Sequence, residues 1–179
     1  IARYLGPNKF GLLSYVNSFV GLFTAISTLG LNGIVVRELV KDKTQRDKII
    51  GTAFWLKLMG AFSVLSILAF AINFMANDTH TNILVFIIAS STIFHSFNVI
   101  DFYFQSKVLS KYIVYANIVS LFISSIVKIT LIINDAPLIA FAWVVLFDSV
   151  VLAVGFLYVF LKNSKFRIQN LIFNKETAI

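Results

Sequence analysis

The stretch YIVYANIVSLFISSIVKITLII, residues 112–133, decides the class of fold. At about 1.5 Å per residue it can cross the roughly 30 Å hydrocarbon core of a bilayer, yet it contains a lysine. Its polar side chains recur every three or four residues: Asn117, Ser120, Ser124 and Lys128. On a helix this spacing gathers them within roughly an 80° arc. We expect this face to contact protein or water, because lipid tails offer polar groups no hydrogen-bond partner.

The composition of the whole chain indicates a membrane protein. Of its 179 residues, 59% are hydrophobic and 13% are charged, whereas soluble domains are about 25% charged. A soluble protein of this size could not bury so much apolar surface, so the bilayer must be the solvent. The absence of cysteine excludes a disulfide framework and cysteine metal sites. The net charge of +7 does not indicate nucleic-acid binding, because the basic residues lie between apolar runs.

The apolar runs predict an all-α polytopic membrane protein with five complete transmembrane helices and the end of another at residues 1–5. The five spans are expected at residues 9–29, 51–74, 82–104, 112–133 and 138–161. Short connections make consecutive helices antiparallel neighbours, and residues 34–48 are expected to form an amphipathic helix at the membrane surface.

Residues 1–161 are thus predicted to form one transmembrane helical lobe. Residues 162–179 are predicted to be a basic cytoplasmic tail, or a linker to a second half. Because the chain starts at Ile1 rather than at methionine, we expect it to be a piece of a longer protein.

Loop charges predict the orientation in the membrane. Eleven of the 15 lysines and arginines fall in three alternate segments: 30–50, 105–111 and 162–179. The segments between them contain only Arg3 and Lys9. By the positive-inside rule the first set faces the cytoplasm, in a multi-pass protein of the inner membrane.

Two further spans carry polar stripes. The stripe on the first span contains Ser14, Asn17, Gly21, Thr24 and Thr28. The stripe on the third span contains Ser91, His95, Asn98, Asp101 and Gln105. Small and hydroxyl residues line helix contacts in membranes, so packing is one interpretation. Amide and charged groups on the same faces favour the other interpretation, which is a hydrated cavity.

Charged residues inside spans are candidates for function, because each costs about 2.5–3.5 kcal/mol at a helix centre. The candidates for a substrate path are Arg3, Arg37, Lys57, Lys128, Asn117, Ser120 and Ser124. The candidates for ion or proton coupling are Asp148, His95 and Asp101. Asp148 lies eleven residues beyond Pro137, roughly 16 Å into its span and near the midplane.

Most of these candidates also have a structural interpretation. Asp148 can be a paired or protonated structural acid, and His95 a neutral, hydrogen-bonded side chain. Lys57 and Lys128 can snorkel, burying the alkyl stem and raising the ammonium to the interface. Lys57 is also placed to form an ion pair with Asp101 on the neighbouring helix.

No enzyme site is expected. The chain has two histidines and lacks the HExxH, GxGxxG, P-loop and GxSxG motifs. We therefore predict no catalytic residue, no metal ligand and no cofactor.

Four motifs resemble bacterial polysaccharide-unit flippases, the O-antigen-type exporters of the multidrug/oligosaccharidyl-lipid/polysaccharide superfamily. The motifs are ARYLGP-x-x-FG at 2–11, LGLNGIVVREL at 29–39, FQSKVLSKYIVYANIVS at 104–120 and APLIAFAW at 136–143. Arg3 falls in the first motif and Arg37 in the second. Apart from the resemblance, Arg3 can be a surface charge and Arg37 a determinant of topology.

The resemblance implies two six-helix lobes around a central cavity, of which this chain is nearly one, the N-terminal half. It implies flipping of undecaprenyl-diphosphate-linked oligosaccharide repeat units for O-antigen, lipopolysaccharide or other surface polysaccharide biosynthesis. The partners expected are the lipid-linked oligosaccharide, membrane lipids, a coupling cation or proton, and a polysaccharide polymerase complex. Two alternatives stay open: a cation-coupled drug antiporter of the same superfamily, with Asp148 and His95 as its ion site, and a non-transporting membrane scaffold.

Overall fold

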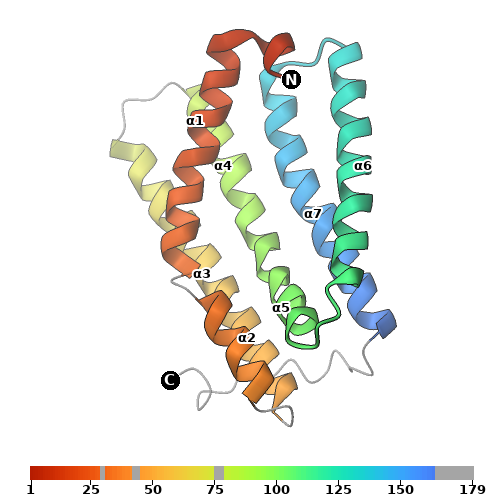
Figure 1. Cartoon of the computed structure of the whole chain (residues 1–179). Helices are drawn as coiled ribbons and strands as arrows, with labels where there is room; N and C mark the ends of the chain where they lie inside the picture. Colours follow the sequence, from red (N-terminus) through yellow and green to blue (C-terminus); the bar gives the residue numbers. More distant parts are fainter. Residues whose placement is uncertain (29–30, 42–44, 75–78, 164–179) are drawn as a thin grey trace.

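The computed structural model describes residues 1–28, 31–41, 45–74 and 79–163, and the regular elements in those ranges are all helical. The elements are α1 (Ala2–Thr28), α2 (Leu31–Lys41), α3 (Arg46–Phe74), α4 (Thr79–Phe94), η1 (His95–Asn98), α5 (Val99–Ser106), α6 (Lys111–Ile133) and α7 (Leu138–Asn163). They run up and down side by side, with α2 and α5 at the end opposite the N-terminus (Figure 1). The predicted tail lies almost wholly outside the described residues.

Four described segments are long and apolar enough to cross a membrane: Arg46–Ile72, Thr79–Ser106, Lys111–Ile133 and Leu138–Asn163. They make the chain a multi-pass membrane protein. The predicted first span corresponds to α1, which is not among these four, and the end of that span lies outside the described residues. The predicted count of five complete helices therefore stays a prediction.

The helix α1 is kinked near its start. Gly6 has φ 73° and ψ 169°, a conformation that side-chain-bearing residues rarely adopt. Pro7 then starts the longer part of α1, where its missing N–H leaves no hydrogen bond unmade. The hydroxyl of Tyr4 donates to the carbonyl of Ala136 over 3.1 Å, which ties this end of α1 to the turn between α6 and α7.

Buried apolar side chains form two separate cores. The α4 core joins α1, α3, α4 and α7 and contains, among others, Val16, Leu68, Leu84, Ala89 and Phe141. The α5 core joins α2, α3, α5, α6 and α7 and contains, among others, Val35, Ile50, Val99, Phe104 and Phe160. Along the third span the 3₁₀ helix η1 stands between the two cores.

The outer surface of the bundle is apolar. Along α6 the exposed side chains are Val114, Tyr115, Ile118, Val119, Leu121, Phe122, Ile123, Ile126, Ile129 and Ile133. Exposed apolar patches of this size on a water-soluble protein would mark contacts with other molecules. On a membrane-spanning helix they are the surface that faces lipid or another hydrophobic partner.

The turn between α5 and α6 contains a strained residue. The N–H of Val108 donates to the carbonyl of Gln105 and that of Leu109 to Phe104, the two bonds of a Schellman motif. Val108 occupies the position where this motif usually has glycine, with φ 58°. A left-handed conformation costs a residue with a side chain roughly 1–2 kcal/mol.

Replacing Val108 with glycine is therefore expected to stabilise the protein. The relief of strain exceeds the entropic cost of glycine, about 0.5–1 kcal/mol, so we expect a net gain of up to about 1 kcal/mol. Unfolding of the detergent-solubilised protein measures it. The matched control is Val114→Gly, at an exposed position inside α6 where glycine should destabilise. Destabilisation by both variants would contradict the strain at Val108.

Candidate functional site

The main polar site lies beside a break in the third span. The segment Thr79–Ser106 is α-helical except at His95–Asn98, where it tightens into the 3₁₀ helix η1. A 3₁₀ segment within a longer helix often marks a functional hinge. The sequence HSFN contains neither proline nor glycine, so no local breaker predicted this change.

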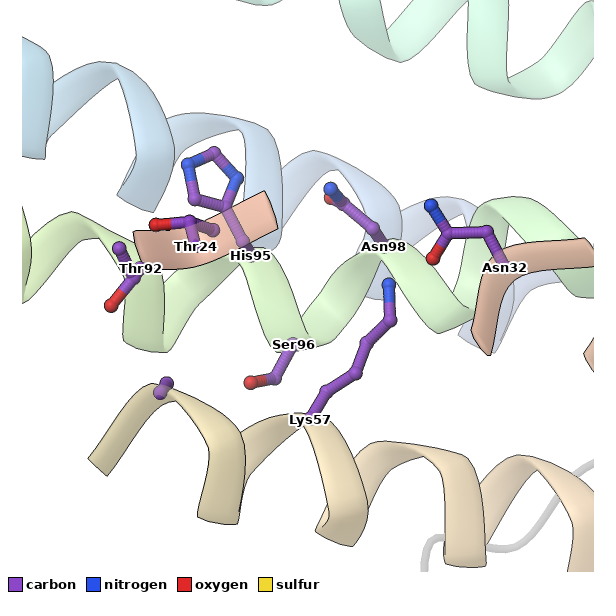
Figure 2. Close-up of a pocket in the computed structure, with 8 residues that line it drawn as sticks. Thr24, Asn32, Lys57, Thr92, His95, Ser96 and Asn98 are labelled. Atoms are coloured by element: carbon purple, nitrogen blue, oxygen red, sulfur yellow. The ribbon is translucent and has the colours of Figure 1, made fainter. Parts of the chain in front are cut away.

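Polar side chains from five elements surround a pocket beside η1 (Figure 2). Its volume is about 210 Å³, the space of roughly seven waters at about 30 Å³ each. The lining residues are Thr24 of α1, Asn32 of α2, Lys57 and Ala61 of α3, Thr92 of α4, and His95, Ser96 and Asn98 of η1. A pocket of this size can hold a phosphate group or a single sugar ring.

Lys57 supplies the charge of the pocket. It is the one lysine, arginine or carboxylate among the lining residues of the described chain. Its ammonium lies 4.4 Å from the centre of the Phe102 ring, a cation–π distance. In Figure 2 its side chain extends toward Asn32 and Asn98. The predicted ion pair with Asp101 is not formed among the described residues.

The hydroxyls of the pocket differ in their hydrogen bonding. Thr24 donates to the carbonyl of Val20 over 2.9 Å, and Thr92 donates to that of Ala89 over 2.7 Å. The hydroxyl oxygen of Ser96 is buried and has no partner within the described chain. An unpaired hydroxyl beside a cavity can bond a ligand or a water there, which makes the pocket hydrogen-bonding as well as cationic.

A second polar cluster joins α6 to α7. The ammonium of Lys128 lies 2.7 Å from a carboxylate oxygen of Asp148 and donates to the hydroxyl of Ser124. Ser124 lies one helical turn further from the C-terminal end of α6 than Lys128 does. The Lys128 ammonium therefore points into the span and not toward the membrane interface. The second oxygen of Asp148 is buried without a partner among the described residues. The ion pair supports the interpretation of Asp148 as a paired acid.

The polar stripe of α6 lies along its contact with α7. Ser120 and Ser124 are buried and Asn117 is half-buried. Farther along the same contact, Gly155 of α7 faces Ala116, and an added Cβ would lie 3.5 Å from that of Ala116, an ordinary van der Waals distance. Small residues that let two helices approach are typical of packing inside membranes. A place for these three residues on a substrate path stays a prediction.

The remaining candidates are neither among the lining residues of the pocket nor part of the α6–α7 cluster. Arg3 is exposed in the first turn of α1. The Arg37 side chain is 74% exposed and meets only its neighbour Glu38, at 3.4 Å, within the described part. Asp101 accepts a hydrogen bond from Gln105 over 3.0 Å. Their roles in transport or coupling stay predictions.

Sequence reasoning placed only part of the pocket. The sequence makes Lys57 a candidate for a substrate path and His95 a candidate for ion or proton coupling, and the structure brings them to the same pocket. Asn32, Thr92 and Ser96 were missed. Asn32 lies in the motif LGLNGIVVREL, whereas Ser96 lies off the regular three-and-four spacing, within the 3₁₀ helix η1.

Comparison with known proteins gives one match. The family model described as "Polysaccharide biosynthesis protein" matches residues 1–178. No curated protein and no solved structure matches the chain.

The ion pair between α6 and α7 should show energetic coupling. Lys128→Ala leaves the Asp148 carboxylate without a counter-ion, and since both side chains are about 30% exposed we expect a loss of about 1–3 kcal/mol rather than the 3–5 kcal/mol of a fully buried pair. The double variant with Asp148→Ala should lose less than the sum of the single variants. A denaturation cycle in detergent measures this coupling.

The exposed pair Arg37–Glu38 is the matched control for that cycle. An exposed pair contributes about 0–1 kcal/mol, so its double variant should be nearly additive. Additive losses at Lys128 and Asp148 as well would show that the contact stabilises nothing.

The two polar regions should differ in access to water. Because the chain has no cysteine, each introduced thiol is unique. We expect membrane-impermeant thiol reagents to modify cysteine at Asn98, in the pocket, much faster than cysteine at Ser120 or Ser124, which are buried. Labelling rates in membrane vesicles open to the reagent on both faces measure the difference. Equal rates would contradict a hydrated pocket separate from the α6–α7 contact.

Proposed function

Because the chain belongs to the polysaccharide biosynthesis protein family, we propose that it helps to flip undecaprenyl-diphosphate-linked oligosaccharide repeat units across the cytoplasmic membrane. The proposed product is surface polysaccharide such as O-antigen. The proposed activity is transport without a catalytic step. The observation that carries the proposal is the pocket, where Lys57 is the sole lysine, arginine or carboxylate among the described lining residues.

The lining of the pocket complements the proposed substrate. A diphosphate carries negative charge, which an ammonium attracts, and sugar hydroxyls need amide and hydroxyl partners. Lys57 offers the ammonium, Asn32 and Asn98 offer amides, and Ser96 offers an unpaired hydroxyl. The exposed apolar side chains of α6 and α7 suit the polyprenyl tail, which stays in lipid.

The size of the pocket limits what it can do alone. About 210 Å³ holds one phosphate or one sugar ring, not a whole repeat unit. We infer that the pocket is one contact point on a longer path, and that the hinge geometry of η1 lets the third span change shape beside it.

The neighbours of Asp148 and His95 argue against the antiporter alternative. A cation site needs a carboxylate that is not already neutralised. Asp148 is paired with Lys128, and His95 shares the pocket with Lys57. Both neighbours are cationic, which favours an anionic ligand over a cationic drug. The scaffold alternative explains the packed stripe of α6 but gives no reason for an open polar pocket.

Lys57→Ala is expected to lower flipping of lipid-linked oligosaccharide about tenfold or more, since a hydrogen bond to a charged group is worth about 1.5–3 kcal/mol. Lys57→Arg should keep most activity because it keeps the charge. Accumulation of lipid-linked repeat units on the cytoplasmic face, at equal protein levels, measures the effect.

The control is Lys48→Ala, an exposed lysine at the start of the same helix. Normal flipping by Lys57→Ala, or equal losses in both variants, would argue against Lys57 as a substrate contact.

A further inference from the structure

The turn between α5 and α6 has a composition that its fold does not explain. Residues 107–111 read KVLSK, two lysines around two apolar residues. Val108 is 90% exposed and holds a left-handed conformation that favours glycine. Exposure and strain both cost stability, and strained residues persist mostly where they serve a function. This turn is therefore a candidate interaction site.

The position of the turn fixes what surrounds it. One membrane-spanning segment ends at Ser106 and the next begins at Lys111. Four residues are too few to leave the bilayer surface, so the turn must lie where lipid headgroups meet the hydrocarbon core. It stands at the same end of the bundle as α2 and the start of α3 (Figure 1).

The two lysines of the turn are held by aromatic rings. The ammonium of Lys107 lies 4.8 Å from the centre of the Tyr103 ring, and that of Lys111 lies 5.1 Å from the centre of the Tyr112 ring. Neither lysine has a carboxylate within ion-pair distance in the described part of the chain. A ring orients an ammonium without neutralising it, so both positive charges remain available to an anion.

The Tyr103 ring is a rigid platform for this charge. Its side chain is buried and packs edge-on against Phe104 and Phe160, at centroid distances of 5.1 and 5.3 Å. Arg46, at the start of α3, lies over the same ring at 5.4 Å and is paired with Asp47 at 2.6 Å. The buried Tyr103 ring thus contacts two basic side chains, Arg46 of α3 and Lys107 of the turn.

We propose that residues 107–111 bind the headgroup of an anionic phospholipid in the leaflet that this end of the bundle faces. Lys107 and Lys111 contact the phosphate, while Val108 and Leu109 reach the apolar boundary below it. Lysine stems suit this depth because their ammonium stays at the headgroups while the carbon chain lies in apolar surroundings. The site is separate from the pocket at η1 and does not rest on the proposed transport activity.

The test compares lipid binding to the purified protein in detergent. Phosphatidylglycerol is the anionic probe and phosphatidylcholine the zwitterionic reference, with bound lipid counted by native mass spectrometry. Lys107→Gln with Lys111→Gln should lower the preference for phosphatidylglycerol about fivefold for each lysine removed, the effect expected of one basic residue at an anionic surface. The double variant Lys107→Arg with Lys111→Arg keeps both charges and should retain the preference for phosphatidylglycerol. A retained preference would also show that the turn still folds.

The matched control is Lys41→Gln with Lys48→Gln, which removes the same charge from exposed lysines at the same end of the bundle. It should retain most of the preference. An equal loss in both double variants would show diffuse electrostatics and overturn the site, as would a wild-type protein without any preference.

Val108→Asn tests the apolar part, because asparagine tolerates the left-handed conformation. It should weaken the binding of both lipids alike. Unchanged binding of both lipids would remove Val108 from the site.

Discussion

A bilayer offers no water to a polar group inside it, and the arrangement of this bundle follows from that constraint. Lys128, Ser124 and Asp148 satisfy one another across the α6–α7 contact. The pocket beside η1 is the other solution, in which polar groups share a space that water or a ligand can fill. Each described basic residue inside a membrane-spanning helix, apart from those at the helix ends, belongs to one of these two arrangements.

The break in the third span separates two kinds of interior. On one side the α4 core packs α1 against α3, α4 and α7, and on the other the α5 core packs α2, α5 and α6. A regular helix through both cores would carry side chains at uniform spacing. His95 and Asn98 share a face at helical spacing, and in the 3₁₀ segment Ser96 lines the same pocket. The polar site therefore coincides with the irregular part of the backbone.

Much of the fold follows from the sequence, because long apolar runs separated by turn residues specify membrane helices. The run at 112–133 and the helix Lys111–Ile133 agree within one residue, and α7 starts at the predicted residue. The site follows less well. Periodicity identifies a polar face but not the neighbour that it meets. The stripe of α6 is therefore compatible with either a packed contact or a hydrated cavity, and in the structure it lies along α7. Lys128 and Asp148 are 20 residues apart in the chain. They meet because they lie at the same level of the neighbouring helices α6 and α7, which the periodicity of either helix alone does not reveal.

The two lysines inside spans show how similar residues acquire different roles. Lys128 is neutralised by a carboxylate at 2.7 Å, so its charge holds helices together and little of it acts at a distance. Lys57 has the face of Phe102 beside it and no ion-pair partner among the described residues. A ring stabilises a cation through its quadrupole and leaves the net charge in place. The pocket thus holds a lysine without an ion-pair partner among the described residues, whereas the α6–α7 contact is close to neutral. The unpaired lysine of the described interior therefore lies beside η1, where the backbone is irregular, and not at the regular contact between α6 and α7.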